Sequence, residues 1–449
     1  MFFKKSKNNK DRTYIGGGYD LVKNDKEDIR DIYITDAERA GHIFGMGTTR
    51  IGKTRLMENM ITQDIQKGYS VVLIDPKGDN DIFSKICQTA FEEDRLEDLF
   101  YTSIINANKS TKFNPLGYYL IPDEIVYHTT SGIVTEEQFY LNVAYETTLV
   151  LTNALILIRK AENNSKNITF KDIKYYASQD DLKKLLNLLE NISFNNKEDK
   201  TIQEDNVHLL KQLVSSPPDY FAKVSSTLRT TLTMLTNGRL GQIIATVNEN
   251  PIIERLESGK RIIFTLQTDA LLTRTPSALL SRLTISMFQS FVGRMFASGE
   301  KINPPLCLYI DEASNVLYNG IENMFNKAGG AGLWITAFTQ SVSDIIAEIG
   351  QDRTKKILDN TNTKLYMRVN DSDTAKFISL ASGTKKGYSQ IMGLGGMFNL
   401  KQEELELVNT DMIMNMGKRE FLFFGPDGRF HGMTAKIQNA YLRISNKAA

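Results

Sequence analysis

Eight consecutive residues, Gly47–Thr54, have the types and the spacing needed to hold a polyphosphate. They read Gly-Thr-Thr-Arg-Ile-Gly-Lys-Thr and fit the pattern G-x-x-x-x-G-K-[ST]. Glycines let the backbone turn closely enough for successive N–H groups to point at a phosphate, and a helix beginning at the lysine adds the positive end of its dipole. Lys53 would then bind the β- and γ-phosphates, while the Thr54 hydroxyl would ligate Mg²⁺. The pattern predicts a site for ATP with Mg²⁺ that is formed by Gly47, Thr48, Thr49, Arg50, Ile51, Gly52, Lys53, Thr54 and Arg55.

An apolar stretch that ends in two acids provides the second half of such a site. Leu306–Ile310 is followed by Asp311 and Glu312. In an ATPase, Asp311 would hold the Mg²⁺ shell and Glu312 would orient and polarise the attacking water. Gln340 follows another apolar stretch and could reach the γ-phosphate, although a polar turn residue explains it as well. We therefore expect Glu312, Gln340 and Lys53 to be the catalytic residues, with Thr54 and Asp311 on the metal.

The helices and strands that must position these residues are predicted to form an α/β protein. Apolar residues recur at helical spacing after Lys53, which predicts a helix there. Strands separated by helices around a phosphate loop predict a mostly parallel sheet covered on both faces. The predicted strands are His42–Phe44, Val71–Ile74, Arg261–Leu266, Leu306–Ile310, Leu333–Ala337, Lys364–Val369 and Glu420–Phe424.

Between residues 116 and 255 the pattern changes to long helical periods with almost no strand signal. We therefore expect a nucleotide-binding core formed by residues 1–115 and 256–449, interrupted by an all-helical inserted domain at 116–255. The first 40 residues are polar and mixed, and Gly16–Gly18 predicts a turn.

Composition excludes several other classes of protein. The formal net charge is only +1, so the chain does not have the basic excess of a protein that coats nucleic acid. Two cysteines, Cys87 and Cys307, indicate a reducing compartment and leave no Cys-rich metal site. The longest apolar stretch, Leu141–Ile158, is interrupted by polar residues and predicts an amphipathic core helix. We expect a cytoplasmic protein.

Together these motifs resemble the type IV coupling proteins, the TraD/TraG class of conjugative ATPases, and most closely the TraD-like proteins of integrative conjugative elements. This resemblance implies a RecA-like P-loop NTPase core and a homo-hexameric ring. It also implies that ATP hydrolysis delivers relaxase-bound DNA to a type IV secretion channel, with DNA, relaxosome proteins and secretion-system components as partners. The segments that carry the resemblance are His42–Arg55, Asp75–Asp79, Phe113–Leu116, Asp311–Glu312, Ala337–Ser341 and Asn360–Lys364.

Two departures from the family affect what the resemblance implies. Coupling proteins usually carry N-terminal transmembrane helices, and none is evident here, so we expect attachment at the inner face of the cell membrane through a partner. TraD-like proteins also tend to have an arginine shortly before the Gln340 strand, where this chain has none. A ring ATPase needs a cation that neutralises the developing charge on the γ-phosphate. We call this cation the finger, and Lys327 and Arg368 are the candidates for it.

Contacts to DNA are predicted only by short basic clusters. Lys355 with Lys356, and Lys385 with Lys386, could line a channel and bind phosphates, although a solvated surface is the more common explanation of such clusters.

Two other functions remain open at this point. A DNA-pumping ATPase of the FtsK/HerA type shares the same core, but the Asp75–Asp79 element and the large helical insertion favour the coupling protein. A nucleotide-gated adaptor would bind ATP and recruit cargo without pumping DNA. The missing arginine and the missing membrane segment favour the adaptor.

Overall fold

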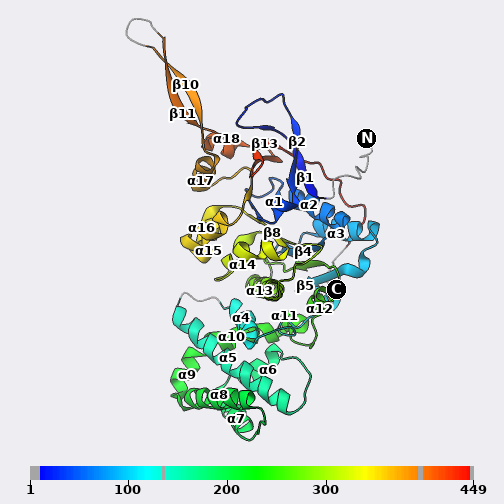
Figure 1. The fold of residues 1–449 in the computed structure, drawn as a ribbon, viewed down its shortest axis with the longest axis vertical. Coiled ribbons are helices and arrows are strands. Elements are labelled where there is room, and N and C mark those ends of the chain that lie inside the picture. Colours follow the sequence, from blue (N-terminus) through cyan, green and yellow to red (C-terminus); the bar gives the residue numbers. More distant parts are fainter. Residues whose placement is uncertain (1–10, 134–136, 393–397, 445–449) are drawn as a thin grey trace. The chain divides into compact units, whose positions relative to one another are not determined.

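The computed structural model describes residues 11–133, 137–392 and 398–444, and Figure 1 shows its helices and strands. The chain forms two compact units, which we describe separately. The first contains the phosphate-loop sequence and comprises the described residues within 11–73, 80–96 and 302–444. The second comprises the described residues within 74–79 and 97–301.

In the parallel part of the first unit's sheet, the phosphate-loop strand has a parallel neighbour on each side. β3 (Ile43–Met46) lies between β8 (Leu333–Thr339) and β9 (Thr363–Tyr366) and is parallel to both, and β7 (Leu306–Asp311) is parallel to β8. Every residue of β3 and β7 is buried, as expected for strands covered on both faces. Parallel strands end at the same edge of a sheet, so the residues that follow these strands meet along one edge. The mostly parallel α/β core predicted from the sequence is confirmed.

An antiparallel extension continues this sheet beyond β9. Its order is β9, β12 (Glu420–Gly425), β13 (Gly428–Thr434), β1 (Arg12–Asp20) and β2 (Arg30–Thr35), with each neighbouring pair antiparallel. Most of this extension was not predicted from the sequence, which indicated only the strand that became β12.

The turn predicted at Gly16–Gly18 is wrong, because these glycines lie inside β1. A Cβ at Gly16 would overlap the carbonyl oxygen of Met433, and one at Gly18 would overlap that of His431, both on β13. The glycines therefore allow a close approach of two strand backbones.

The helices of the first unit connect these strands. α2 (Lys53–Lys67) follows the phosphate loop, and it ends at Gly68, which has a left-handed backbone with φ +84°. β10 (Thr384–Met392) and β11 (Phe398–Glu406) form a separate antiparallel ribbon, drawn in orange in Figure 1. The other helices are α1 (Asp36–Arg39), α3 (Asn80–Glu92), α14 (Glu322–Lys327), α15 (Val342–Ile349), α16 (Gln351–Asp359), α17 (Ser372–Ser382) and α18 (Thr410–Asn415).

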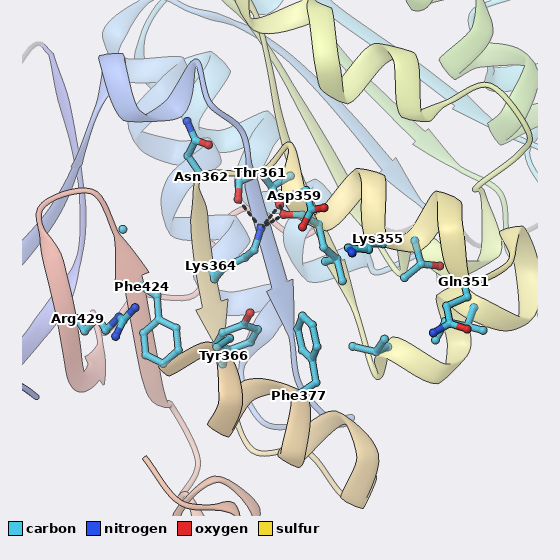
Figure 2. A pocket seen from close by; sticks show the side chains of 16 residues that line it. Gln351, Lys355, Asp359, Thr361, Asn362, Lys364, Tyr366, Phe377, Phe424 and Arg429 are labelled. Atoms are coloured by element: carbon cyan, nitrogen blue, oxygen red, sulfur yellow. Dashed lines mark hydrogen bonds between the residues drawn. The ribbon is translucent and has the colours of Figure 1, made fainter. Parts of the chain in front are cut away.

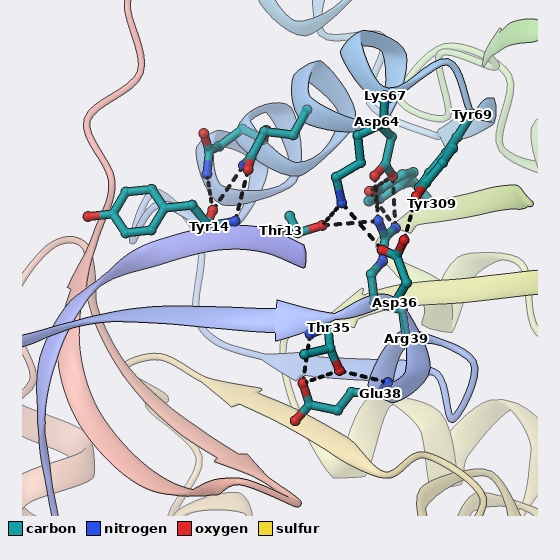
Figure 3. Close-up of polar contacts among 12 residues, drawn as sticks. Thr13, Tyr14, Thr35, Asp36, Glu38, Arg39, Asp64, Lys67, Tyr69 and Tyr309 are labelled. Atoms are coloured by element: carbon teal, nitrogen blue, oxygen red, sulfur yellow. Dashed lines mark hydrogen bonds and ion pairs between the residues drawn. The ribbon is translucent and has the colours of Figure 1, made fainter. Parts of the chain in front are cut away.

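A buried ion pair joins α1 to α2 and is hydrogen-bonded to the strand that carries the acids (Figure 3). Arg39 and Asp64 form a bidentate pair, and their side chains are 1% and 0% exposed. Tyr309 on β7 accepts a hydrogen bond from Arg39 at 2.9 Å and donates one to Asp64. Burial alone would lower the pKa of Arg39, but the neighbouring Asp64 raises this pKa well above its usual range, so the guanidinium stays charged. This cluster fixes the far end of α2 against β7.

The second unit is mainly helical. It contains one parallel strand pair, β5 (Leu99–Ser103) with β6 (Ile263–Gln267). Between residues 116 and 255, the described part of the chain contains helices and no strand, while the compact unit extends beyond these limits on both sides. The division into three segments therefore stays a prediction. The helices are α4 (Pro122–Ser131), α5 (Gln138–Ala161), α6 (Phe170–Tyr175), α7 (Gln179–Glu190), α8 (Lys197–Ser215), α9 (Pro218–Val224), α10 (Ser226–Thr236), α11 (Gly238–Ile244), α12 (Pro251–Glu257) and α13 (Arg274–Ser298).

Among the described residues, α5 is the one helix long and apolar enough to cross a membrane, on length and composition alone. Within this helix, 56% of the most apolar window is buried in the protein. A buried core helix passes the same test of length and composition.

Candidate nucleotide-binding site

Strand register brings the predicted halves of the site to one edge of the sheet. Met46 at the end of β3 is paired with Thr339 on one side and Tyr366 on the other. On the next strand, Asp311 pairs with Phe338. The phosphate loop, the two acids and Gln340 therefore emerge next to one another, all within the first unit.

The phosphate loop is held from both sides by backbone hydrogen bonds. Gly47 N–H donates to the carbonyl of Thr339 at 3.1 Å, and Thr48 N–H donates to the carbonyl of Arg368 at 2.7 Å. The loop ends at Gly52, whose φ of +123° suits glycine and starts α2 without a side-chain cap. The N-terminal N–H groups of α2 are thus left for an anion, as this motif requires.

Lys53 carries the positive charge of the loop. Its side chain is 4% exposed, and its ammonium donates to the carbonyl oxygens of Gly47 and Thr48, the latter at 3.1 Å. The cation thus lies inside the loop, where a bound polyphosphate would lie.

Thr54 and Asp311 lie together, as the predicted metal site requires. The Thr54 hydroxyl donates to Asp311 Oδ2 at 3.3 Å, and the carboxylate is buried at 1% exposure. A hydroxyl and a carboxylate oxygen are the ligands that Mg²⁺ accepts in nucleotide sites. The residues present therefore fit a magnesium ion bound together with phosphates.

Glu312 is held by three donors from its own neighbourhood. Gln340 Nε2 donates to one carboxylate oxygen at 2.9 Å, while Thr339 and Ser314 hydroxyls donate to the other at 3.4 and 3.2 Å. Its backbone has φ +72°, which is costly for a residue with a side chain and recurs at functional sites. The geometry presents an oriented carboxylate one residue beyond the metal-site acid, with Gln340 directly attached to it.

Arg55 has partners that the sequence did not indicate. Its guanidinium donates to Glu58 at 2.7 Å, to the carbonyl of Ile437 at 2.9 Å and to Asn439 at 2.7 Å. The chain beyond β13 thus passes beside the start of α2. A role for Arg55 at the nucleotide stays a prediction.

The two finger candidates lie at opposite edges of the sheet. Arg368 lies two residues after the end of β9, and its carbonyl accepts a hydrogen bond from Thr48 N–H, so it borders the phosphate loop of its own chain. Lys327 is exposed at the end of α14, which precedes the first residue of β8. A Cβ at nearby Gly329 would overlap the carbonyl of Ala40, which precedes the first residue of β3. This segment therefore lies where the parallel strands begin. Lys327 therefore lies at the edge of the sheet opposite the phosphate loop of its own chain, and its role as a finger stays a prediction.

Residues from the C-terminal part of the chain also hold the loop, and sequence reasoning missed them. Arg419 donates its backbone N–H to the carbonyl of Ile51 at 2.9 Å and has φ +71°. Asn370 Nδ2 donates to the Thr48 hydroxyl at 3.1 Å. Neither belongs to a recognisable motif, and no sequence signal could have revealed these long-range contacts.

In the second unit, Asp75 organises its own loop. Its carboxylate accepts backbone N–H groups from Lys77 at 3.0 Å, Gly78 at 3.2 Å and Asp79 at 2.6 Å. Gln267 on β6 donates to it at 3.2 Å. The Asp-Pro-Lys-Gly segment is therefore a closed turn around an acceptor carboxylate.

Comparison with solved structures supports the RecA-like P-loop fold that the resemblance implies. TrwBdeltaN70, a bacterial conjugative coupling protein, superposes with a TM-score of 0.66 at 15% identity, covering 91% of this chain and 88% of its own. Plasmid coupling protein TrwB in complex with ADP and Mg²⁺ gives 0.62 at 14% identity, covering 91% and 88%. VirB4 of Thermoanaerobacter pseudethanolicus gives 0.54 at 14% identity, covering 95% and 96%. No curated protein sequence matches the chain.

One segment of the sequence, residues 305–418, matches a family model. Its description is the TraM recognition site of TraD and TraG. The match supports the resemblance to the type IV coupling proteins of the TraD/TraG class. A closer kinship with the TraD-like proteins of integrative conjugative elements stays a prediction.

Proposed function

We propose that this chain hydrolyses ATP and uses the energy to deliver relaxase-bound DNA to a type IV secretion channel. The observation that carries the proposal is the oriented Glu312 carboxylate, held by Gln340, next to the Thr54–Asp311 pair. The structures of TrwB with an ATP analogue and with ADP and Mg²⁺ support ATP and Mg²⁺ as the ligands. The family match favours a coupling protein over an FtsK/HerA-type pump.

Each residue has one task in this proposal. The Gly47–Gly52 backbone and Lys53 bind the phosphates, and Thr54 and Asp311 hold Mg²⁺, which neutralises phosphate charge when bound. Glu312 accepts a hydrogen bond from the attacking water and draws its proton. Gln340, already bonded to Glu312, couples the position of this carboxylate to the γ-phosphate.

The partners and the assembly belong to the same proposal. We infer a homo-hexameric ring, relaxosome and secretion-system proteins as partners, and attachment to the inner face of the membrane through one of them. The description of the family model, a recognition site for TraM, supports a protein partner for residues 305–418.

The proposed DNA contacts lie in two separate places. Lys356 is exposed on α16, and Lys385 and Lys386 lie near the start of β10. Lys386 is opposite Glu404 on β11, which reduces the positive potential there. Lys355 lines a cavity beside α16, so its contact to DNA is the least supported of the four.

Steady-state ATP hydrolysis with and without DNA is the experiment that tests the proposed function. We expect measurable Mg²⁺-dependent turnover that rises several-fold with single- or double-stranded DNA. Tight ATP binding with negligible turnover, indifferent to DNA, would instead indicate the adaptor. Retention of a relaxase by the immobilised chain would separate a coupling protein from a chromosome-segregation motor.

The placement of Lys327 and Arg368 predicts different kinetic behaviour for their variants. Arg368→Ala should slow hydrolysis in the isolated chain, because Arg368 borders the phosphate loop of the same chain. Lys327→Ala should slow it only under conditions where the chains assemble. A true finger contributes about 10³–10⁵ in rate. Rates measured across a range of protein concentrations distinguish the two, and wild-type rates in both variants would exclude both residues.

A further inference from the structure

A cavity of about 620 Å³ lies on the first unit, in the segment matched by the family model and just beyond it (Figure 2). Helices α15, α16 and α17 form one side, and strands β9, β12 and β13 form the other. Its volume is in the range of sites that bury a ligand or one or two side chains. Among its lining residues, Phe424, Gly425 and Arg429 fall outside residues 305–418.

The floor of this cavity is formed by buried aromatic side chains. Tyr366 is fully buried and Phe424 is 7% exposed, and their rings pack edge to face with centroids 5.3 Å apart. Phe377 on α17 completes the aromatic lining, as Figure 2 shows. Because Tyr366 and Phe424 pack against each other, their faces are not open platforms on which nucleic-acid bases could stack.

The apolar surface continues onto the rim. Ile346, which lines the cavity, is 38% exposed, and Leu380, next to the lining residue Ala381, is 78% exposed. Exposed apolar side chains around a hollow are typical of a surface that docks another protein. This extension favours a peptide segment over a small molecule held entirely inside.

Two cations border the cavity without an acidic partner. Among the described residues, Lys355 and Arg429 form no ion pair, and Arg429 donates only to the carbonyl of Ser382 while its guanidinium carbon lies 5.7 Å from the Phe424 ring centroid. A third cation, Lys364, donates to the carbonyl of Leu358 at 2.6 Å and to Thr361. Burial lowers the pKa of Lys364 to about 7, although Asp359 opposes this shift. Asp359 is the one acid on the lining, so the cavity has an excess of positive charge.

We propose that this cavity binds an acidic peptide segment of a protein partner, with an apolar side chain inside and its carboxylates toward Lys355 and Arg429. The apolar floor supplies affinity, and the two cations select acidic over basic segments. The identification of the partner as a relaxosome protein rests on the proposed function, whereas the chemistry of the segment does not.

Fluorescence anisotropy of the full chain with two labelled peptides tests this proposal. The acidic probe is Asp-Phe-Glu-Leu-Asp-Gly, and its charge-reversed counterpart is Lys-Phe-Lys-Leu-Lys-Gly. We expect the acidic peptide to bind at least about tenfold more tightly than the basic one. Equal affinity for both peptides, or binding of neither, would overturn the proposal.

A matched pair of variants on one helix locates the site. Lys355→Glu should weaken binding of the acidic peptide by about tenfold or more. Lys356→Glu makes the same charge change at the adjacent exposed position, which does not line the cavity, and should leave binding unchanged. Ala381→Trp should block binding by filling the cavity rim without changing the charge. If both lysine variants weakened peptide binding equally, the cavity would not be the site.

Two further measurements separate this proposal from its alternatives. If labelled single-stranded DNA bound preferentially and Lys355→Glu reduced only DNA binding, the surface would be a DNA contact and the peptide proposal would be wrong. The wild-type ATP hydrolysis rate tests the proposed function alone. Hydrolysis without peptide binding overturns only the cavity proposal, and peptide binding without hydrolysis overturns only the motor.

Discussion

Glu312→Gln is expected to lower the rate of ATP hydrolysis by about 10²–10⁴-fold while ATP is still bound. The substitution keeps the size of the side chain but removes the negative charge that would draw a proton from water. Asp311 and Lys53 remain in place, so binding of Mg²⁺ and of the phosphates should persist. Single-turnover hydrolysis and equilibrium binding of a fluorescent ATP analogue measure the two quantities separately.

Two other variants serve as controls for this experiment. Lys53→Ala should lose nucleotide affinity as well as hydrolysis, because it removes the charge inside the phosphate loop. Glu300→Gln makes the same chemical change at an exposed position of the second unit and should behave as wild type. If Glu312→Gln hydrolysed ATP at the wild-type rate, another group would have to activate the water, and the assignment would be wrong.

Asp64→Ala is expected to lower the free energy of unfolding of the first unit by about 3–5 kcal/mol. The reason is that Arg39, fully buried next to Tyr309 and Trp334, would keep its charge without a carboxylate partner. Tyr309→Phe removes one hydroxyl from the same cluster and should cost only about 1 kcal/mol. Shifts in the midpoint of urea-induced unfolding measure both effects.

A double variant and a surface control make this prediction specific. Replacing both partners, Arg39→Met with Asp64→Leu, should recover a large part of the lost stability, because no buried charge is then left unpaired. Asp28→Ala breaks the exposed pair with Arg30, whose side chains are 40% and 53% exposed, and should cost about 0–1 kcal/mol. If Asp64→Ala were no more harmful than Asp28→Ala, the buried pair would not hold α2 against β7.

Much of the nucleotide site could be predicted because its signals are local in sequence. The phosphate loop needs glycines and a lysine at fixed spacing, and the acids directly follow a run of apolar residues. Parallel strands end at one edge of a sheet, so the residues that follow β3, β7 and β8 were expected at the same edge, whereas the order of these strands became visible only in the structure. Gln340 was found in the same way, although its bond to Glu312 became visible only in the structure.

Where the prediction failed, the competing effect was a contact between residues far apart in the chain. Gly16–Gly18 has the composition of a turn, but the approach of β13 requires glycines inside a strand. The contact of Arg55 with Asn439 was likewise not indicated by the sequence, while its role at the nucleotide stays a prediction. The conformational propensity of a residue reflects the local free-energy cost of a backbone conformation. It does not indicate which distant segment of the chain will pack against that residue.

The sequence by itself determined that this chain has a phosphate-loop pattern and a strand ending in two acids on an α/β core, because these residues are recognised by type and by local spacing. Only the tertiary structure decided how α2 is anchored through Arg39 and Asp64. It also decided at which edge of the sheet each finger candidate lies and where a cavity forms between α16 and β9. These features depend on the burial of charge and on packing across hundreds of residues, and such interactions leave no periodic or local pattern in the sequence.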